Sequence, residues 1–109
     1  MTREKSYRKQ DKVEKILKDV LMYIANRGEM RLIDGENTIV LDFKENGQLN
    51  SEKLTDFSVL LIKEFRDLFK GYRRGDCSKF EKKLIRLGKP KDIMRYIIKK
   101  TYNSWVGKK

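Results

Sequence analysis

Apolar residues recur at a helical spacing early in the chain. They stand at positions i, i+3, i+4, i+7, i+8 and i+11, and they are Val13, Ile16, Leu17, Val20, Leu21 and Ile24. This spacing places them on one side of a helix. Gly28 follows the last turn, where a left-handed residue commonly ends a helix. Ser6 and Asp11 can both cap a helix, so we expect this one to begin between them.

The period then changes from helical to two residues over residues 29–43, which predicts a β-hairpin. With Asp34–Asn37 as a four-residue loop, one face of the hairpin holds Met30, Leu32, Ile39, Leu41 and Phe43. The other face then holds Arg31, Thr38, Val40 and Asp42. A loop of residues 34–35 alone would break this match, so we expect the longer loop. The pair Asn46-Gly47 predicts a second turn after the hairpin.

A broad apolar face predicts a central helix over residues 51–70, capped by Asn50 or Ser51 and ended by Gly71. Its apolar positions are Leu54, Phe57, Leu61, Ile62, Phe65, Leu68 and Phe69, with Val59 and Leu60 beside them. So wide an apolar face indicates a helix at the centre of the fold, or one that another subunit partly covers. A homodimer or a protein partner on this helix therefore stays open.

A short helix is expected over residues 78–87, with Phe80, Leu84 and Leu87 facing inward. Gly88 and Pro90 then mark a stop and a restart, and the last helix runs to about Trp105. The predicted fold class is mostly α (α+β), a single compact helical domain of about four helices with one β-hairpin between the first and second. This domain spans residues 1–109. It divides into a basic N-terminal tail (1–10), a helix-hairpin-helix core (11–70) and a basic helical C-terminal region (71–109).

The amino-acid composition excludes several kinds of catalytic site, metal site and membrane segment. The 109 residues are 39% hydrophobic, enough for a modest core, and no apolar run is long enough to span a bilayer. Histidine is absent and Cys77 is the single cysteine, which excludes Ser-His and Cys-His nucleophile pairs and the usual zinc sites. We therefore expect a non-enzymatic protein with no metal, no cofactor and no membrane partner. A cytoplasmic location is expected, because no signal peptide and no disulfide is indicated, and a virus or plasmid could encode the chain.

The net charge of +11 is concentrated toward the end of the chain. Residues 71–109 hold 13 Lys/Arg against 3 Asp/Glu, whereas residues 21–50 hold 3 against 5. Such a concentration is typical of a surface that binds a polyanion, because each neutralised phosphate releases condensed counterions. The alternative interpretation is a basic tail that only increases solubility.

The last helix is amphipathic, with a basic outer face. At about 100° per residue, its inward side is expected to hold Met94, Ile97, Ile98, Thr101 and Trp105, with Ile93 at the margin. Its outward side then holds Asp92, Arg95, Tyr96, Lys99 and Asn103. Arg and Asn can make paired contacts to base edges, Lys favours phosphate, and an outward Tyr96 could stack on an unpaired base. The alternative is an ordinary surface helix whose cations are solvated.

These observations predict a small nucleic-acid-binding protein, for example a transcriptional or replication-associated regulator. The residues expected to bind nucleic acid are Arg73, Arg74, Lys82, Lys83, Arg86, Lys89, Lys91, Arg95, Tyr96, Lys99, Lys100 and Asn103. Tyr96 and Asn103 are expected to contact bases, and Arg73 and Arg74 are expected in a loop between two glycines. DNA is favoured over RNA because the last two helices have a helix–turn–helix-like spacing. Leu84, however, stands where that motif usually has a small residue.

Two other functions compete with this one. An interaction or accessory subunit of a larger nucleoprotein complex would dock through the apolar excess of the central helix. A Mg²⁺-dependent nuclease would use Asp34, Asp42 and Lys44, which follow the acid…acid-x-Lys pattern of restriction-type nucleases. The expected register places the two carboxylates roughly 10 Å or more apart, too far for one ion to bridge, so the nuclease is the least favoured function.

Overall fold

A computed structural model of the protein describes the backbone of residues 2–107 and the side chains of residues 8–107. In chain order the elements are α1 (Thr2–Arg27), β1 (Glu29–Asp34), β2 (Asn37–Asp42), β3 (Lys44–Glu45), β4 (Gln48–Leu49), α2 (Ser51–Arg74), α3 (Lys79–Leu87) and α4 (Pro90–Gly107). The fold is mostly α, with an antiparallel hairpin between α1 and α2, which confirms the predicted fold class. Within the described chain, no helix is both long and apolar enough to cross a bilayer.

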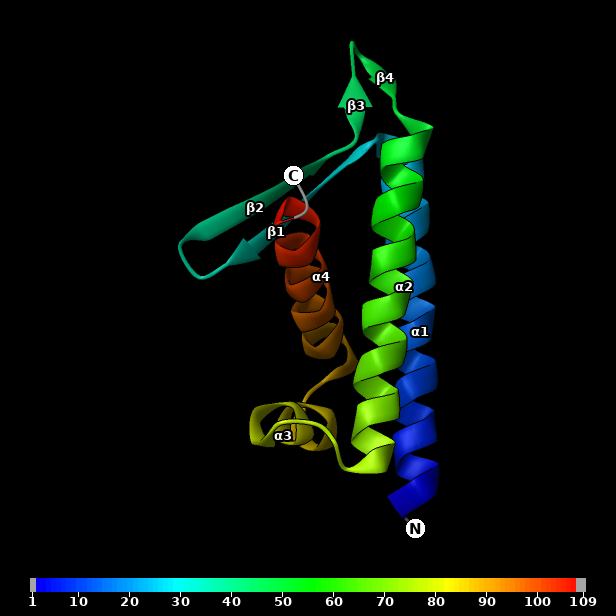
Figure 1. Ribbon diagram of the computed structural model, residues 1–109, viewed down its shortest axis with the longest axis vertical. Coiled ribbons are helices and arrows are strands. Elements are labelled where there is room, and N and C mark those ends of the chain that lie inside the picture. The colour runs from blue at the N-terminus through cyan, green and yellow to red at the C-terminus, as the bar shows by residue number, and fades with distance from the viewer. Residues whose placement is uncertain (1, 108–109) are drawn as a thin grey trace.

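Three helices pack side by side along an elongated molecule that measures 51 × 24 × 24 Å. Figure 1 shows α1 and α2 running in opposite directions, with α4 beside them. At one end of the molecule, α3 lies next to the beginning of α1 and the end of α2. Both hairpins lie at the opposite end. The two ends are therefore built from different segments of the chain.

α1 begins at Thr2, before the predicted start between residues 6 and 11. Farther along α1, Lys9 bonds to α3 and Gln10 bonds to the end of α2. Residues 2–10 are therefore helical and do not form the predicted tail. Residue 1 of that tail lies outside the described part of the chain.

β1 and β2 pair in the predicted register, in which Leu32 lies opposite Ile39. The loop has two residues and not four, because Asp34 and Asn37 still pair across the ladder. This additional pair extends the hairpin without changing which residues face each other. The buried side chains of the inner face are Leu32, Leu41 and Phe43, and Met30 and Ile39 pack partly buried beside them.

β3 and β4 form a second hairpin that the sequence pattern did not predict. The turn between them was predicted, and both of its residues have positive φ, 56° at Asn46 and 79° at Gly47. Two positive φ angles are what the tightest hairpin turns require, and Asn-Gly is the pair best suited to them. Strands of two residues are too short to show a period, so the turn was predictable and the pairing was not.

Aromatic side chains fill the core at the hairpin end. Phe43 follows β2, and its ring centroid lies 5.2 Å from that of Phe57 in α2 and 5.5 Å from that of Trp105 in α4. Full burial of one such side chain stabilises a fold by about 1.5–3 kcal/mol. This cluster therefore joins the hairpin to two helices. The buried residues of α4 match the predicted inward side and are Ile93, Met94, Ile97, Ile98 and Thr101.

α2 is longer than predicted. It runs to Arg74, so Gly71 lies inside the helix and does not end it. Gly75, with φ of 79°, ends the helix, and its N–H bonds to carbonyls of the last turn. Gly71 serves packing instead, since a Cβ there would lie 3.2 Å from the sulfur of Cys77. The predicted cap at Asn50 is confirmed, because its side chain accepts a backbone N–H of the first turn.

α3 is rotated about its axis relative to the prediction. Phe80 and Leu87 were expected to face inward, but they are 62% and 68% exposed, and Ile85 is the buried residue. Two adjacent sides of this short helix carry apolar residues, so the spacing alone does not decide which side faces inward. Contacts of Glu81 with α4 decide it, because they turn the side with Glu81 and Ile85 toward the bundle.

Candidate nucleic-acid interface

One side of α3 is entirely cationic. Its residues stand at i, i+3, i+4 and i+7, and they are Lys79, Lys82, Lys83 and Arg86. All four side chains are exposed, and none forms an ion pair with a described residue. Positions three and four apart are neighbours on a helix, so the charges form one surface, called here the α3 cationic face. Like charges held this close repel each other, which a bound anion would relieve.

The α3 cationic face is flanked by exposed cations from three other segments. Arg73 and Arg74 lie in the last turn of α2, and Lys89 and Lys91 lie between α3 and α4 and in the first turn of α4. Arg73 also donates a 2.6 Å hydrogen bond to the amide oxygen of Gln10 in α1. Arg74 lines a shallow hollow together with Asp67, Lys70 and Asp76.

Lys9 fixes α1 against this end of the molecule. Its ammonium donates hydrogen bonds to the carbonyl oxygens of Ile85 (2.7 Å) and Arg86 (3.1 Å). Those carbonyls belong to the last turn of α3, where intrahelical donors are missing and a cation is favourable. Burial, and then repulsion by Lys12, lowers the pKa of Lys9. Cations from both ends of the sequence therefore meet at one end of the molecule, which we call the basic end.

Tyr96 and Lys100, two of the predicted interface residues, contact acidic residues within the protein. Tyr96 is half-buried, and its hydroxyl donates a 3.1 Å hydrogen bond to Glu81. Burial, and then the charge of Glu81, raises the pKa of Tyr96 to about 12. The Lys100 ammonium lies 3.7 Å from Glu81 and 3.9 Å from Glu64. These contacts join α3, α4 and α2, so Tyr96 and Lys100 have structural partners in the free protein.

The outer face of α4 is crossed by the hairpin. Lys99 lies 2.5 Å from the carboxylate of Asp34 at the hairpin turn. Arg95 and Asn103 are exposed one helical turn before and one turn after Lys99. A duplex lying along the whole outer face of α4 would meet the hairpin at this point. Arg95 is on the side toward α3, and it can join the basic end.

The connection between α3 and α4 is a tight turn of two residues. Gly88 donates its N–H to the carbonyl of Leu84 at 2.7 Å. A Cβ at this position would lie 2.3 Å from that same oxygen, so a side chain cannot be accommodated without backbone movement. Glycine at this position therefore allows α3 and α4 to be joined by only two residues.

No protein-family model, curated protein or solved structure matches this chain. Its function is therefore inferred from its own residues.

The residues of the nuclease hypothesis are not brought together. Asp34 pairs with Asn37 at the turn of the hairpin, whereas Asp42 pairs with Glu29 at its other end. Lys44 lies near that other end, 4.0 Å from the Glu29 carboxylate. Among the described residues, no three His, Cys, Asp or Glu side chains gather in a way that could hold a metal ion.

Residues 21–62, at the hairpin end, have the opposite charge balance to the basic end. Residues 21–62 form the end of α1, both hairpins and the first half of α2, and they contain only four Lys/Arg. Their seven acidic residues are Glu29, Asp34, Glu36, Asp42, Glu45, Glu52 and Asp56. Charge is thus sorted along the long axis of the molecule, and a polyanion has one end to bind.

The predicted interface left out Lys9, Lys79 and Phe80, which the structure places at the basic end. The spacing of Lys79 with the other cations of α3 is readable from the sequence, and it would have shown that this side faces solvent. Phe80 was assigned to the core because of its apolar side chain. Its exposure depends on how α3 is rotated, which tertiary contacts determine.

Proposed function

We propose that this protein binds nucleic acid without catalysis, through phosphate contacts at its basic end. The α3 cationic face is the observation that carries the proposal, because its four charges have no ion-pair partner among the described residues. Successive charges on it lie about one helical turn, roughly 5.4 Å, apart. Arg73, Lys89, Lys91 and Arg95 extend the surface on neighbouring elements.

Phosphate contacts of this kind make affinity strongly dependent on salt. Each contact contributes about −0.9 to the slope of log K against log salt on duplex DNA and about −0.7 on a single strand. Contacts from the α3 cationic face alone therefore predict a duplex slope of about −4, and the flanking cations steepen it. The preference for DNA over RNA rests on the helix–turn–helix-like spacing of α3 and α4.

A salt titration against duplex DNA, single-stranded DNA and RNA tests the proposal. The variant Lys82→Glu/Arg86→Glu reverses two charges of the α3 cationic face and should abolish most binding. Arg27→Glu/Arg31→Glu is the matched control, because it changes the net charge equally at the hairpin end. If the α3 variant binds all three polymers as tightly as wild type, the proposal is wrong.

A second candidate is an interaction subunit of a nucleoprotein complex. A hollow of about 610 Å³ beside the first turns of α2 favours it, lined by Lys53, Val59, Leu60 and Trp105 among others. Val59 is 61% exposed there, as the broad apolar face of α2 predicted. This candidate predicts weak binding of the isolated protein to every polymer. If a second copy fills the hollow, sedimentation should show a dimer that Val59→Glu dissociates.

A further inference from the structure

We infer that the ligand of the basic end is a single strand, with an unpaired base stacked on the ring of Phe80. This inference rests on the proposed function and specifies its substrate class. It assigns to Phe80 a contact that the sequence pattern had given to Tyr96.

Phe80 is exposed to solvent, and its ring packs against Tyr96. Phe80 is 62% exposed, and its ring centroid lies 5.6 Å from that of Tyr96 at an interplanar angle of 64°. This edge-to-face contact supports the Phe80 ring, and the exposure of Phe80 shows that part of its side chain stays open to solvent. Tyr96 is itself held by its hydrogen bond to Glu81. The ring is thus partly ordered before binding, which lowers the entropic cost of stacking a base on it.

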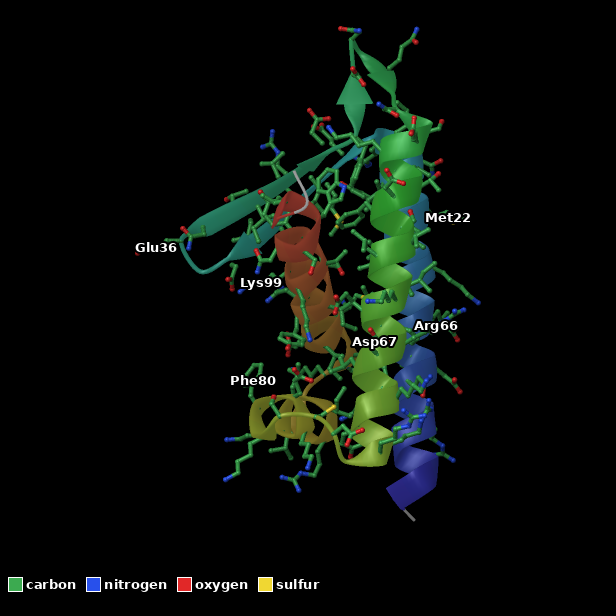
Figure 2. The ribbon with its side chains drawn as sticks, viewed as in Figure 1. Met22, Glu36, Arg66, Asp67, Phe80 and Lys99 are labelled. Carbon is green, nitrogen blue, oxygen red and sulfur yellow. The ribbon has the colours of Figure 1, made fainter. Side chains whose placement is uncertain are left out.

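The position of Phe80 on α3 suits a strand whose phosphates and bases point in different directions. By the helical period, Phe80 lies between the α3 cationic face and the buried side that holds Ile85. Lys83 and Lys79 are its nearest cationic neighbours on the helix surface. Phosphates can therefore lie on the cations while a base turns toward the ring. Figure 2 shows Phe80 projecting from α3 on the side toward the hairpin, below Lys99.

Duplex DNA cannot use this arrangement, because its bases are stacked inside the helix and present only their edges in the grooves. Unpaired bases expose a whole ring face, and single-strand-binding proteins combine aromatic stacking with a cationic path for the backbone. The combination of an exposed aromatic ring with an adjacent row of cations is the feature that favours the single strand.

Leu87 is the alternative explanation for this surface, because it is 68% exposed and lies on the same side of α3 as Phe80. Together they could form an apolar patch for a protein or an anionic membrane. Two side chains are small, however, beside the roughly 800 Å² that each partner of a standard protein interface buries. A membrane accepts leucine as well as phenylalanine as apolar surface, so membrane binding would not depend on the aromatic ring. Leu87 therefore provides the discriminating control.

Binding to a 20-nucleotide oligo(dT), at constant salt, tests the inference. Phe80→Ala should weaken binding about 5- to 150-fold, the range for loss of one stacked base. Phe80→Leu should weaken it similarly, because leucine keeps apolar surface but has no ring face. Leu87→Ala should bind within about twofold of wild type, and all three variants should keep the wild-type salt slope. Circular dichroism checks that each is folded, which the exposure of both side chains favours.

Distinct outcomes separate the inference from the proposed function. If Phe80→Ala binds oligo(dT) as tightly as wild type, or if duplex is bound more tightly than the single strand, the inference is overturned while phosphate binding stands. Equal losses in Phe80→Ala and Leu87→Ala with rescue by Phe80→Leu, or tighter binding to anionic phosphatidylserine vesicles, would show an apolar docking surface instead. If Lys82→Glu/Arg86→Glu has no effect, the proposed function itself fails.

Discussion

Tyr96 donates its phenolic hydrogen bond to the carboxylate of Glu81, 3.1 Å away, and so connects α4 to α3. The bond turns one side of α3 toward the bundle and the opposite side, with its cations, toward solvent. It also places Tyr96 against the ring of Phe80. A single part-buried contact between two helices thus helps to determine which residues α3 presents at the surface.

Tyr96 should titrate late. Burial and Glu81 raise its pKa from 10.0 to about 12, so the folded protein holds this proton more tightly than the unfolded chain does. The contribution of Tyr96 to stability is therefore complete below about pH 10 and is lost as the pH rises through about 12. Tyrosinate absorbance should show a late phase that is missing in Tyr96→Phe. A late phase that persists in this variant would assign it to another tyrosine.

Replacing Lys9 should loosen α1 from α3. Lys9→Met keeps most of the aliphatic stem but leaves the carbonyls of Ile85 and Arg86 without their donor. We expect the free energy of unfolding to fall by about 0.5–1.5 kcal/mol, measured by urea denaturation. Lys12→Met is the matched control, because Lys12 is exposed and its loss removes a repulsion from Lys9. Equal losses in the two variants would contradict this role for Lys9.

Gly88→Ala should destabilise the turn between α3 and α4. The added Cβ would lie 2.3 Å from the carbonyl oxygen of Leu84, and backbone cannot move aside as a flexible side chain can. We expect a cost of about 1–3 kcal/mol, as for other overpacked sites. At Gly107, near the end of α4, an added Cβ meets nothing within 4 Å, so Gly107→Ala should be neutral or slightly stabilising. Thermal unfolding of both variants makes the comparison.

Asp34→Asn should strengthen nucleic-acid binding. The substitution releases Lys99 from its ion pair and leaves the hairpin turn otherwise intact. If Lys99 then reaches a phosphate, the salt slope on a single strand should steepen by about 0.7. Stability should change by less than about 1 kcal/mol, because both side chains are partly exposed. Glu36→Gln, in the same turn, changes the net charge equally without an ion pair to Lys99, and it should leave the slope unchanged.

Much of the fold was predictable because its periods are long and clear. The register of β1 and β2 followed from the shared apolar face, since a shift of one residue would have exposed Leu32. Most of the inward side of α4 followed in the same way. The strand register and the inward side of α4 both depend on which residues are apolar, and the order of apolar residues can be read from one sequence.

The end of α2 and the rotation of α3 were not predictable in this way. Gly71 has the residue type of a helix end, but the sulfur of Cys77 needs the space that its missing side chain leaves. Phe80 has the residue type of a core position, but α3 is held by Lys9 and Glu81, which come from polar positions. Packing and polar contacts decided both, and the periodicity of the sequence does not contain them.

The sorting of charge along the molecule has a consequence for how it would meet a polyanion. A rod 51 Å long with a basic end and an acidic end is a permanent electric dipole, so a polyanion would turn it before any contact forms. It would arrive end-on, with α3 toward the polymer and the hairpins pointing away. Each molecule would then occupy its width of 24 Å along the polymer, and not its length. Molecules bound side by side would stand on the polymer as a dense row, their acidic ends outward.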